Sequence, residues 1–301
     1  MLTGLLRLFA KLPLAWLHSA GVVLGWLAYR LSPSYANRLR ENLLQSGVCD
    51  DPARLAKLLR RCTFEAGKAV AEVPAMWFRP QLESTSWIRN AEGLDLIANA
   101  RTLGKGIIVL TPHLGCFELL AQYYALNNPI TVLYRPPHFG PLEPAMRAGR
   151  TRPNIRLATT DVSGVRQLLK ALHKGESIGV LPDQVPGAGD GAWADFFGRP
   201  AYTMTLWSRL AERSKAAVIM AYARRLPGGA GFDVHFESMP PREPGETPAR
   251  HLNRSLENII RRFPEQYLWA YNRYKVPAGA QGPSAAPATD ESVEKPTGIN
   301  S

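Results

Sequence analysis

A histidine and a glutamate, His113 and Glu118, stand five residues apart in the stretch GIIVLTPHLGCFELL, residues 106–120. On a regular helix this spacing would set the two side chains about 140° apart, and Pro112 disfavours a helical conformation for the residue before it. The pattern predicts a strand, a tight turn that carries His113, and a helix that begins near Leu114. The Glu118 carboxylate could then fold back toward the imidazole, and a histidine held by a carboxylate can act as a general base. A structural histidine after a strand would show the same spacing.

Cys116 lies inside the same stretch and could be a thiol nucleophile. Its neighbours in CFELL are mostly apolar, and a free cysteine is commonly a small buried hydrophobic residue, so we expect Cys116 to pack rather than react. The stretch is not HExxH, and no other His or Cys stands at ligand spacing, so we expect no metal. The chain has 3 cysteines and no CxxC pair, which fits a reducing compartment.

Two more polar residues follow apolar runs. Arg135 ends ITVLYR and could bind a phosphate through two hydrogen bonds, or lie at the surface as an ordinary arginine. Asp183, followed by Gln184, ends SIGVLPD and could be a site residue or a turn or helix-cap residue. Ligands of open α/β sheets bind outside the carboxyl ends of strands. Polar residues after three strands, at His113, Arg135 and Asp183, therefore favour one functional site at that edge.

A group of cations and a glycine-rich loop extend this picture. Arg147, Arg150 and Arg152 could form a cationic funnel for an anionic headgroup, or a solvated basic face. No GK[ST] follows the loop Gly187–Gly191, so we do not expect a nucleotide P-loop. A flexible loop tipped with aromatic residues better suits an apolar chain or the bilayer surface, and the aromatic residues here are Trp193, Phe196 and Phe197.

The elements that must position these residues alternate along the chain. We expect strands at 106–110, 130–134, 155–158, 177–181, 217–222, 232–237 and 266–271. Helices are expected between them at 93–101, 114–126, 142–150, 162–174, 203–213 and 247–263, with earlier ones at 37–49 and 52–78. Asp51 could cap the last of these, with Pro52 in its first turn. The alternation predicts an α/β fold with a mostly parallel central sheet flanked by helices.

The N-terminus adds an apolar segment. Residues 12–31 are about one hydrocarbon thickness long as a helix and carry aromatic residues near the ends, which predicts a membrane span or a deep membrane-surface anchor. His18, Ser19 and two glycines dilute the signal, so an amphipathic or buried helix is the alternative. We expect a membrane anchor helix at 1–32, a catalytic domain at 33–276, and a disordered tail at 277–301 that is rich in Pro, Gly, Ala, Ser and Thr.

The charge balance points to an anionic partner. The chain of 301 residues has 36 Lys and Arg against 25 Asp and Glu, a formal net charge of +11. Nucleic acid, an anionic membrane surface and phosphorylated or acidic substrates would all suit this excess. No zinc-finger, RNA-recognition or basic-zipper pattern occurs, so we do not expect nucleic acid.

Taken in order, the segments TPHLGCFE, VLYRPP, GRTRPNI, KGESIGVLPDQ, FFGRPAYT and PEQYLWAYNRYK resemble the lipid A biosynthesis acyltransferases, the lauroyl and myristoyl transferases of Gram-negative bacteria. The resemblance runs from the N-terminal apolar helix to about Lys275. One departure stands near the end, where QYLWAYNRYK has Tyr271, Asn272 and Tyr274 against an expected QYxWxHRRFK. That departure leaves the acceptor and the acyl chain length open.

The resemblance implies a single-pass enzyme of the inner membrane, with its active site on the cytoplasmic side. Such enzymes transfer a fatty acyl chain from acyl carrier protein to a hydroxyl of a Kdo-bearing lipid A precursor, without a cofactor. By position, His113 and Glu118 match the catalytic Hxxxx[DE] pair. Arg135 and Arg150 match basic segments that would face substrate phosphates, and Asp183 matches the acid after the later strand.

A thioester donor is already activated, so the base need only deprotonate the acceptor hydroxyl. We expect backbone N–H groups near Leu114–Cys116 to stabilise the oxyanion that develops on the thioester carbonyl. Two alternatives remain at this point. The chain could acylate a different lipid, such as a lysophospholipid, glycolipid or aminolipid, or it could be a non-catalytic membrane protein that binds anionic lipid.

Overall fold

The protein is described here by a computed structural model that covers residues 2–136, 140 and 143–283. Its helices are α1 (Leu2–Phe9), α2 (Leu14–Leu31), α3 (Pro33–Gln45), α4 (Pro52–Phe78), α5 (Gln81–Thr85), α6 (Leu94–Thr102), α7 (Phe117–Tyr124), α8 (Glu143–Arg150), α9 (Val162–His173), α10 (Leu206–Ser214) and α11 (Pro248–Arg262). Two short 3-10 turns are η2 (Pro227–Gly229) and η3 (Pro264–Gln266).

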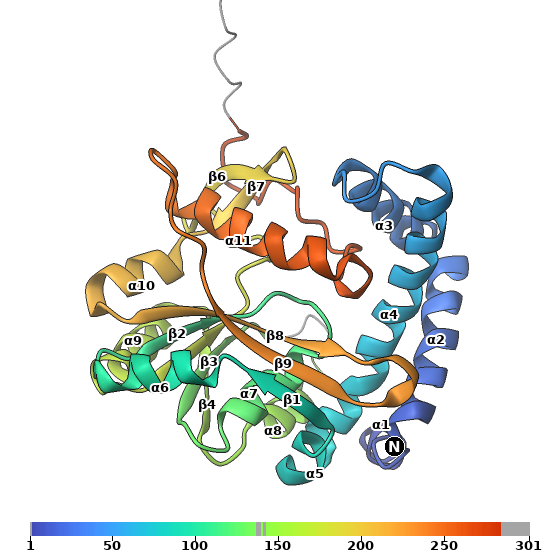
Figure 1. The fold of residues 1–301 in the computed structure, drawn as a ribbon, viewed down its shortest axis with the longest axis horizontal. Helices are drawn as coiled ribbons and strands as arrows, with labels where there is room; N and C mark the ends of the chain where they lie inside the picture. The colour runs from blue at the N-terminus through green and yellow to red at the C-terminus, as the bar shows by residue number, and fades with distance from the viewer. Residues whose placement is uncertain (1, 137–139, 141–142, 284–301) are drawn as a thin grey trace, which may run out of the picture.

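Seven strands form the main sheet: β1 (Ile88–Glu92), β2 (Ile107–Leu110), β3 (Ile130–Tyr134), β4 (Ile155–Thr159), β5 (Ser177–Val180), β8 (Ala217–Arg225) and β9 (Phe232–Ser238). Their order is β1-β9-β8-β2-β5-β3-β4. Every neighbouring pair is parallel except β8 and β9. The expected mostly parallel sheet flanked by helices is therefore confirmed (Figure 1).

The central strands are buried on both faces, and alternate residues belong to two separate cores. Ile108 and Leu110 of β2 pack in a cluster with residues of α9, α10 and α11. Ile107 and Val109 point the other way, into a cluster with residues of α6 and α7. Because side chains alternate across a strand, the run IIVL feeds both layers of helices. The helix α4 contributes to both clusters and stands beside the sheet (Figure 1).

Local signals fix the start of several helices. The Asp51 side chain accepts a hydrogen bond of 2.7 Å from the backbone N–H of Arg54 at the start of α4, as expected for a cap followed by Pro52. Thr247 caps α11 in the same way, again with a proline in the first turn.

The expected strand at 266–271 is wrong. The segment is a 3-10 turn followed by irregular chain, and its backbone hydrogen bonds go to the loop after β2 instead of to the sheet. Gly115 donates to the Gln266 carbonyl at 3.1 Å, and Leu268 donates to the His113 carbonyl at 3.1 Å. Its apolar residues are buried against this loop, which explains why the sequence looked like a strand.

A second sheet was also missed. The strands β6 (Gly191–Phe196) and β7 (Arg199–Met204) form an antiparallel hairpin where a flexible loop and the start of a helix were expected. The aromatic residues do not tip this loop into solvent, since Phe196 and Phe197 are buried. The loop before the hairpin is held by the Tyr202 hydroxyl, which accepts the N–H of Gly189 at 3.0 Å.

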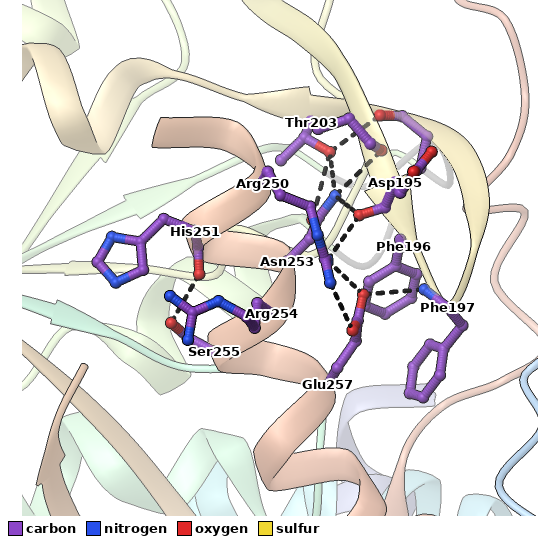
Figure 2. A network of polar contacts seen from close by, with 12 residues as sticks. Asp195, Phe196, Phe197, Thr203, Arg250, His251, Asn253, Arg254, Ser255 and Glu257 are labelled. Atoms are coloured by element: carbon purple, nitrogen blue, oxygen red, sulfur yellow. Dashed lines mark hydrogen bonds and ion pairs between the residues drawn. The ribbon is translucent and has the colours of Figure 1, made fainter. Parts of the chain in front are cut away.

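Figure 2 shows the polar network that fastens this hairpin to α11. Glu257 of α11 accepts the backbone N–H of Phe197 at 2.9 Å and also pairs with Arg250 at 2.7 Å. The Asn253 amide donates to the Asp195 carbonyl at 2.9 Å and to the Thr203 hydroxyl at 3.0 Å. The network fixes both hairpin strands on one helix, and thereby the loop that precedes them.

The N-terminal apolar segment forms α2, but its expected role as a spanning helix is not supported. In residues 2–136, 140 and 143–283, no helix has both the length and the hydropathy to cross a bilayer. Of the residues that diluted the apolar signal, Ser19 is exposed, whereas His18 and the two glycines face α4. His18 hydrogen-bonds Glu72 at 2.7 Å, and a side chain at Gly21 or Gly25 would overlap the α4 backbone. Of the expected tail at 277–301, residues 284–301 lie outside the described residues.

Candidate active site

The three polar strand ends predicted from the sequence do meet at one edge of the sheet. The strands β2, β5 and β3 are consecutive parallel neighbours, so their carboxyl ends lie side by side. His113 follows β2, Asp183 follows β5 and Arg135 follows β3. All three line cavities at this edge.

Asp183 holds His113 at two points. Its Oδ1 lies 2.8 Å from the ring Nδ1, and its Oδ2 accepts the His113 backbone N–H at 2.9 Å. The carboxylate is only 2% exposed. Burial by itself would raise the pKa of the Asp183 carboxyl, but the adjacent His113 outweighs it and holds that pKa below its usual range. The buried group therefore stays an anion that faces the imidazole.

This contact determines the tautomer of the imidazole. A carboxylate can only accept, so the His113 Nδ1 carries the proton and donates it to Asp183. The Nε2 atom then has a free lone pair, and it lies 3.2 Å from the Gln184 Nε2, which can donate to it. The ring also rests on Phe117, with centroids 4.7 Å apart. Such a histidine, fixed on one nitrogen and open on the other, can accept a proton from a bound hydroxyl.

The Glu118 carboxylate is paired with an arginine and not with His113. Its carboxylate is bound by Arg150, whose Nε lies 3.1 and 3.0 Å from the two oxygens and whose Nη2 also donates to it. Burial lowers the Arg150 pKa, but the Glu118 charge more than offsets this and leaves that pKa raised. The expected contact between Glu118 and His113 is not formed, because the parallel pairing of β2 and β5 brings Asp183 to the His113 Nδ1 instead. A catalytic role for Glu118 stays a prediction.

The expected oxyanion donors in the loop are already used. Leu114 donates its N–H to the Pro112 carbonyl at 2.7 Å, and Cys116 donates to the Ala223 carbonyl at 2.9 Å. Gly115 donates to Gln266, as described above. It has φ +60°, and a Cβ there would overlap the Ala223 carbonyl oxygen, so only glycine suits this close approach. These N–H groups fix the loop and are not available to a substrate.

Cys116 is buried, as expected from its apolar neighbours. Burial, and next the nearby Glu72 carboxylate, raise the pKa of its thiol well above the ordinary value. The thiolate that a nucleophile requires is therefore disfavoured.

Two cavities meet at the imidazole. The first, of about 460 Å³, is lined by His113, by charged side chains, among them Glu118, Arg135, Arg150 and Arg209, and by a larger number of apolar side chains such as Phe117 and Leu157. It is called the charged cavity below, after the side chains that distinguish it from the second. The second, of about 500 Å³, is mostly apolar and lies among α2, α4 and the segment 267–271. Both include His113 and Gln184 in their walls, so the imidazole faces a cavity that holds several charged side chains and a second cavity that is mostly apolar.

The arginines expected to form one funnel are divided. Arg150 reaches the charged cavity, Arg147 is exposed, and Arg152 turns to the end of α4, where it donates to the Trp77 carbonyl at 2.6 Å. Arg209 of α10 also lines the charged cavity, and it was missed because the place where α10 packs depends on tertiary contacts that one sequence does not reveal. Gln184 was noticed only as the neighbour of Asp183, and its role as a contact of His113 could not be predicted from one sequence.

A buried ionic network lies directly behind the His113 loop. Glu72 of α4 pairs with Arg225 at the end of β8, with 2.7 Å between its Oε2 and Nη2, and also with His18. Arg225 in turn exchanges hydrogen bonds with Gln266: the Arg225 N–H donates at 2.8 Å, and the Gln266 amide donates back at 2.9 Å. Gln266 is also the residue that accepts from Gly115, so the network supports the loop from behind.

Tyr271, one of the residues that depart from the expected C-terminal pattern, contacts the segment that follows Asp183. The Tyr271 hydroxyl accepts the backbone N–H of Val185 at 2.9 Å, two residues after Asp183. Tyr271 also lines the apolar cavity. In the described residues, no group of three or more His, Cys, Asp or Glu side chains is arranged to hold a metal ion.

Comparison with known proteins gives a consistent answer. The sequence profile of the family described as bacterial lipid A biosynthesis acyltransferase matches residues 1–276. A lipid A biosynthesis lauroyltransferase of Escherichia coli (strain K12) is 27% identical over 277 residues, which cover 90% of this chain and 89% of the relative. A lipid A biosynthesis palmitoleoyltransferase of the same strain is 28% identical over the same shares of each chain. A lipid A biosynthesis acyltransferase of Haemophilus influenzae is 29% identical over 180 residues, or 59% of this chain and 56% of the relative.

Proposed function

The chain belongs to the bacterial lipid A biosynthesis acyltransferase family and is an acyltransferase, and from that premise we propose how it works. It transfers a fatty acyl chain from acyl carrier protein to a hydroxyl of a phosphorylated, Kdo-bearing lipid A precursor. The observation that carries the proposal is the His113–Asp183 pair, whose open Nε2 lies between a charged cavity and an apolar one.

In the proposed reaction the acceptor hydroxyl gives its proton to the His113 Nε2 as its oxygen attacks the thioester carbonyl carbon. Asp183 keeps the proton on Nδ1 and stabilises the imidazolium that forms. The tetrahedral intermediate then collapses, the carbon–sulfur bond breaks, and the imidazolium returns its proton to the leaving thiolate. The proton of the acceptor hydroxyl thus ends on the thiol of the carrier, and no acyl-enzyme intermediate is required.

The developing oxyanion needs a donor other than the loop N–H groups. We assign the role of oxyanion donor to the Gln184 amide. Gln184 lines both cavities, and its Nε2 lies 3.2 Å from the His113 Nε2. A substrate oxygen that displaces the imidazole from this amide would accept its hydrogen bond.

We assign the charged cavity to the acceptor. Arg150 is already neutralised by Glu118, so its proposed role is to shape the wall of the cavity. Arg135 and Arg209 line the same space, and among the described residues neither forms an ion pair, so we propose that they meet the acceptor phosphates.

The apolar cavity suits a fatty acyl chain. Its walls include Leu24, Ala28, Ala66, Val70 and Leu268, with Tyr271 near the imidazole. A saturated chain that lies there would bring its thioester carbonyl to His113, and the size of these wall residues would limit the chain length.

Membrane association is proposed from the outer faces of the first two helices. The face of α2 that points away from α4 exposes Trp16, Val23, Trp26, Leu27 and Leu31, and α1 exposes Leu5 and Leu8. We propose that these helices lie in the interface of the inner membrane, on its cytoplasmic side, with the catalytic cavities near the headgroups.

The proposal is tested by mass spectrometry of lipid A from cells that lack the gene and carry it again on a plasmid. The wild-type gene should add the mass of one acyl group, and a His113→Ala gene should not. His173→Ala removes an exposed histidine at the end of α9 and is the matched control, which should restore the acyl group. Unchanged lipid A together with a mass shift in another lipid class would favour a different acceptor. Acylation by the His113→Ala protein would contradict the mechanism.

A further inference from the structure

A third cavity lies away from the catalytic edge, where α1, the end of α4, α5 and the end of α8 come together. It has a volume of about 650 Å³. In Figure 1 these elements gather at the N-terminal end of the molecule, near the label N. The helix α8 separates it from the charged catalytic cavity: Met146 and Arg150 line the catalytic space, whereas Ala148 and Gly149 line this one.

The cavity is strongly cationic. Its walls carry Arg7, Lys11, Arg79 and Arg152 against a single acid, Glu83. Glu83 is 58% exposed and lies 3.5 Å from Arg79, which is a weak contact. Two buried or half-buried arginines elsewhere are closely paired with carboxylates: Arg150 with Glu118, and Arg225 with Glu72. No acidic side chain among the described residues pairs with Arg7, Lys11 or Arg152.

Two buried donors of the cavity residues have no acceptor. Arg152 donates through Nη2 to the Trp77 carbonyl at 2.6 Å and to the Met76 and Arg79 carbonyls at 3.2 Å. Its Nε and the indole Nε1 of Trp77 are buried and have no partner among the described residues. A buried donor without an acceptor costs roughly 1–3 kcal/mol, so the wall of this cavity leaves part of its hydrogen-bonding capacity unused.

The surroundings select an anion that has an apolar part. The same helix that supplies Arg7 exposes Leu5 at 64% and Leu8 at 67%, and α5 exposes Leu82 at 73%. Trp77 and Phe78 form part of the cavity wall, and Arg7 lies over the Phe78 ring at 5.7 Å. Cations above aromatic rings beside exposed leucines suit the level of the lipid headgroups.

We propose that this cavity binds the phosphate headgroup of an anionic membrane phospholipid, with its acyl chains against the exposed leucines of α1. The site is separate from the catalytic cavities, and it does not rest on the acyl-transfer mechanism. Its occupation would hold the N-terminal helices on the membrane while the substrates exchange.

The test measures binding of dihexanoyl phosphatidylglycerol, a monomeric short-chain lipid, to full-length protein by isothermal titration calorimetry below its micellar concentration. The double variant Arg7→Gln/Lys11→Gln removes two exposed charges from the cavity. The matched control, Lys105→Gln/Lys174→Gln, removes two exposed charges near the opposite, amino ends of the strands. A charge-preserving variant, Arg7→Lys/Lys11→Arg, checks that a loss of binding reflects charge and not misfolding.

We expect saturable binding by the wild type, the control and the charge-preserving variant, and binding at least about tenfold weaker in Arg7→Gln/Lys11→Gln. Equal binding by that variant would overturn the site, and so would an equal loss in the control. Inorganic phosphate at the same concentration should not displace the lipid. If it does, the cavity is a general phosphate site and the lipid assignment is wrong. A His113→Ala protein should bind normally, so failure of this proposal and failure of the catalytic one are distinguishable.

Discussion

Among the residues that the structure describes, two histidines contact a buried carboxylate, and only one of these two pairs faces a cavity. His113 and Asp183 are 2.8 Å apart, and His18 and Glu72 are 2.7 Å apart. Both carboxylates are almost fully buried, at 2% and 1% exposed. By distance and by the burial of the carboxylate, the two pairs could not be told apart.

The difference lies in what surrounds each pair. Asp183 uses its second oxygen on the backbone N–H of His113, which leaves the ring Nε2 open to both cavities. Glu72 is bound by Arg225 as well, and the free Nδ1 of His18 is buried beside the Phe232 ring. In the proposed mechanism the first pair holds the general base, whereas the second pair connects α2 to α4 and to the end of β8. A histidine–carboxylate contact therefore indicates catalysis only when the other ring nitrogen can reach a ligand.

The largest effect on turnover is expected at His113. We expect His113→Ala to lower kcat by about a thousandfold or more, since general-base catalysis contributes 10²–10⁴ and the substrate hydroxyl would be left without an acceptor. The melting temperature should change little, because the ring lines a cavity and is partly exposed. An acyl-transfer assay with purified enzyme and a thermal melt measure the two effects. Near-normal turnover in a folded His113→Ala protein would remove the distinction between the pairs.

The opposite behaviour is expected at Glu72. Glu72→Ala leaves Arg225 buried without its main carboxylate and should lower the free energy of unfolding by about 3–5 kcal/mol. Glu72→Ala combined with Arg225→Met should recover part of this loss, because no unpaired charge then remains. Urea titration measures the stabilities. The Glu72→Ala protein that remains folded should keep most of its kcat. A stable Glu72→Ala protein with little turnover would instead indicate that the His18–Glu72 pair is catalytic.

Acid should weaken the structural pair over a defined range of pH. Burial alone would raise the pKa of Glu72, but Arg225 outweighs it and holds that pKa at about 2, below the ordinary 4.5. A lowered folded-state pKa stabilises the protein above about pH 4.5, and this stability is lost as the pH falls toward 2. The contribution is on the order of 3 kcal/mol. Unfolding measured between pH 6 and 2 should show a steeper loss for the wild type than for Glu72→Gln, and parallel curves would contradict the assignment.

The smallest effect is expected at Cys116, which lies in the middle of the His113 loop motif and near the Glu72 carboxylate. Cys116→Ser should leave kcat within about threefold, because the thiol is buried and its pKa is raised, so it is not the nucleophile. The buried hydroxyl should cost about 1–2 kcal/mol of stability. Loss of turnover in a folded Cys116→Ser enzyme would point to a thiol mechanism after all.

The parts of this site that could be predicted are those set by local pattern. Apolar runs such as 106–110 and 177–181 predicted strands, and the polar residue after each run marked the edge where ligands bind. This placed His113, Arg135 and Asp183 at one edge, which the strand order confirmed.

The partners of these residues could not be predicted, since they depend on which strands are neighbours. Five residues of sequence separate His113 from Glu118, and 70 separate it from Asp183, yet the parallel pairing of β2 and β5 makes Asp183 the contact. The loop between His113 and α7 is likewise pinned by Ala223 and Gln266, far away in sequence. The role of His18 was missed for the same reason, because its partner Glu72 lies on another helix.

In the proposed mechanism Asp183, and not Glu118, keeps the proton on the His113 Nδ1 and stabilises the imidazolium. One pair of matched variants tests this most directly. Asp183→Asn and Glu118→Gln each replace a carboxylate by its amide, and both are assayed for kcat and for KM of the acceptor across pH. We expect Asp183→Asn to lower kcat by about 10³–10⁴ with little change in KM, since the amide can stabilise the wrong imidazole tautomer. Glu118→Gln should act mainly through Arg150 and raise the acceptor KM. A Glu118→Gln enzyme that loses kcat while Asp183→Asn keeps it would contradict the account.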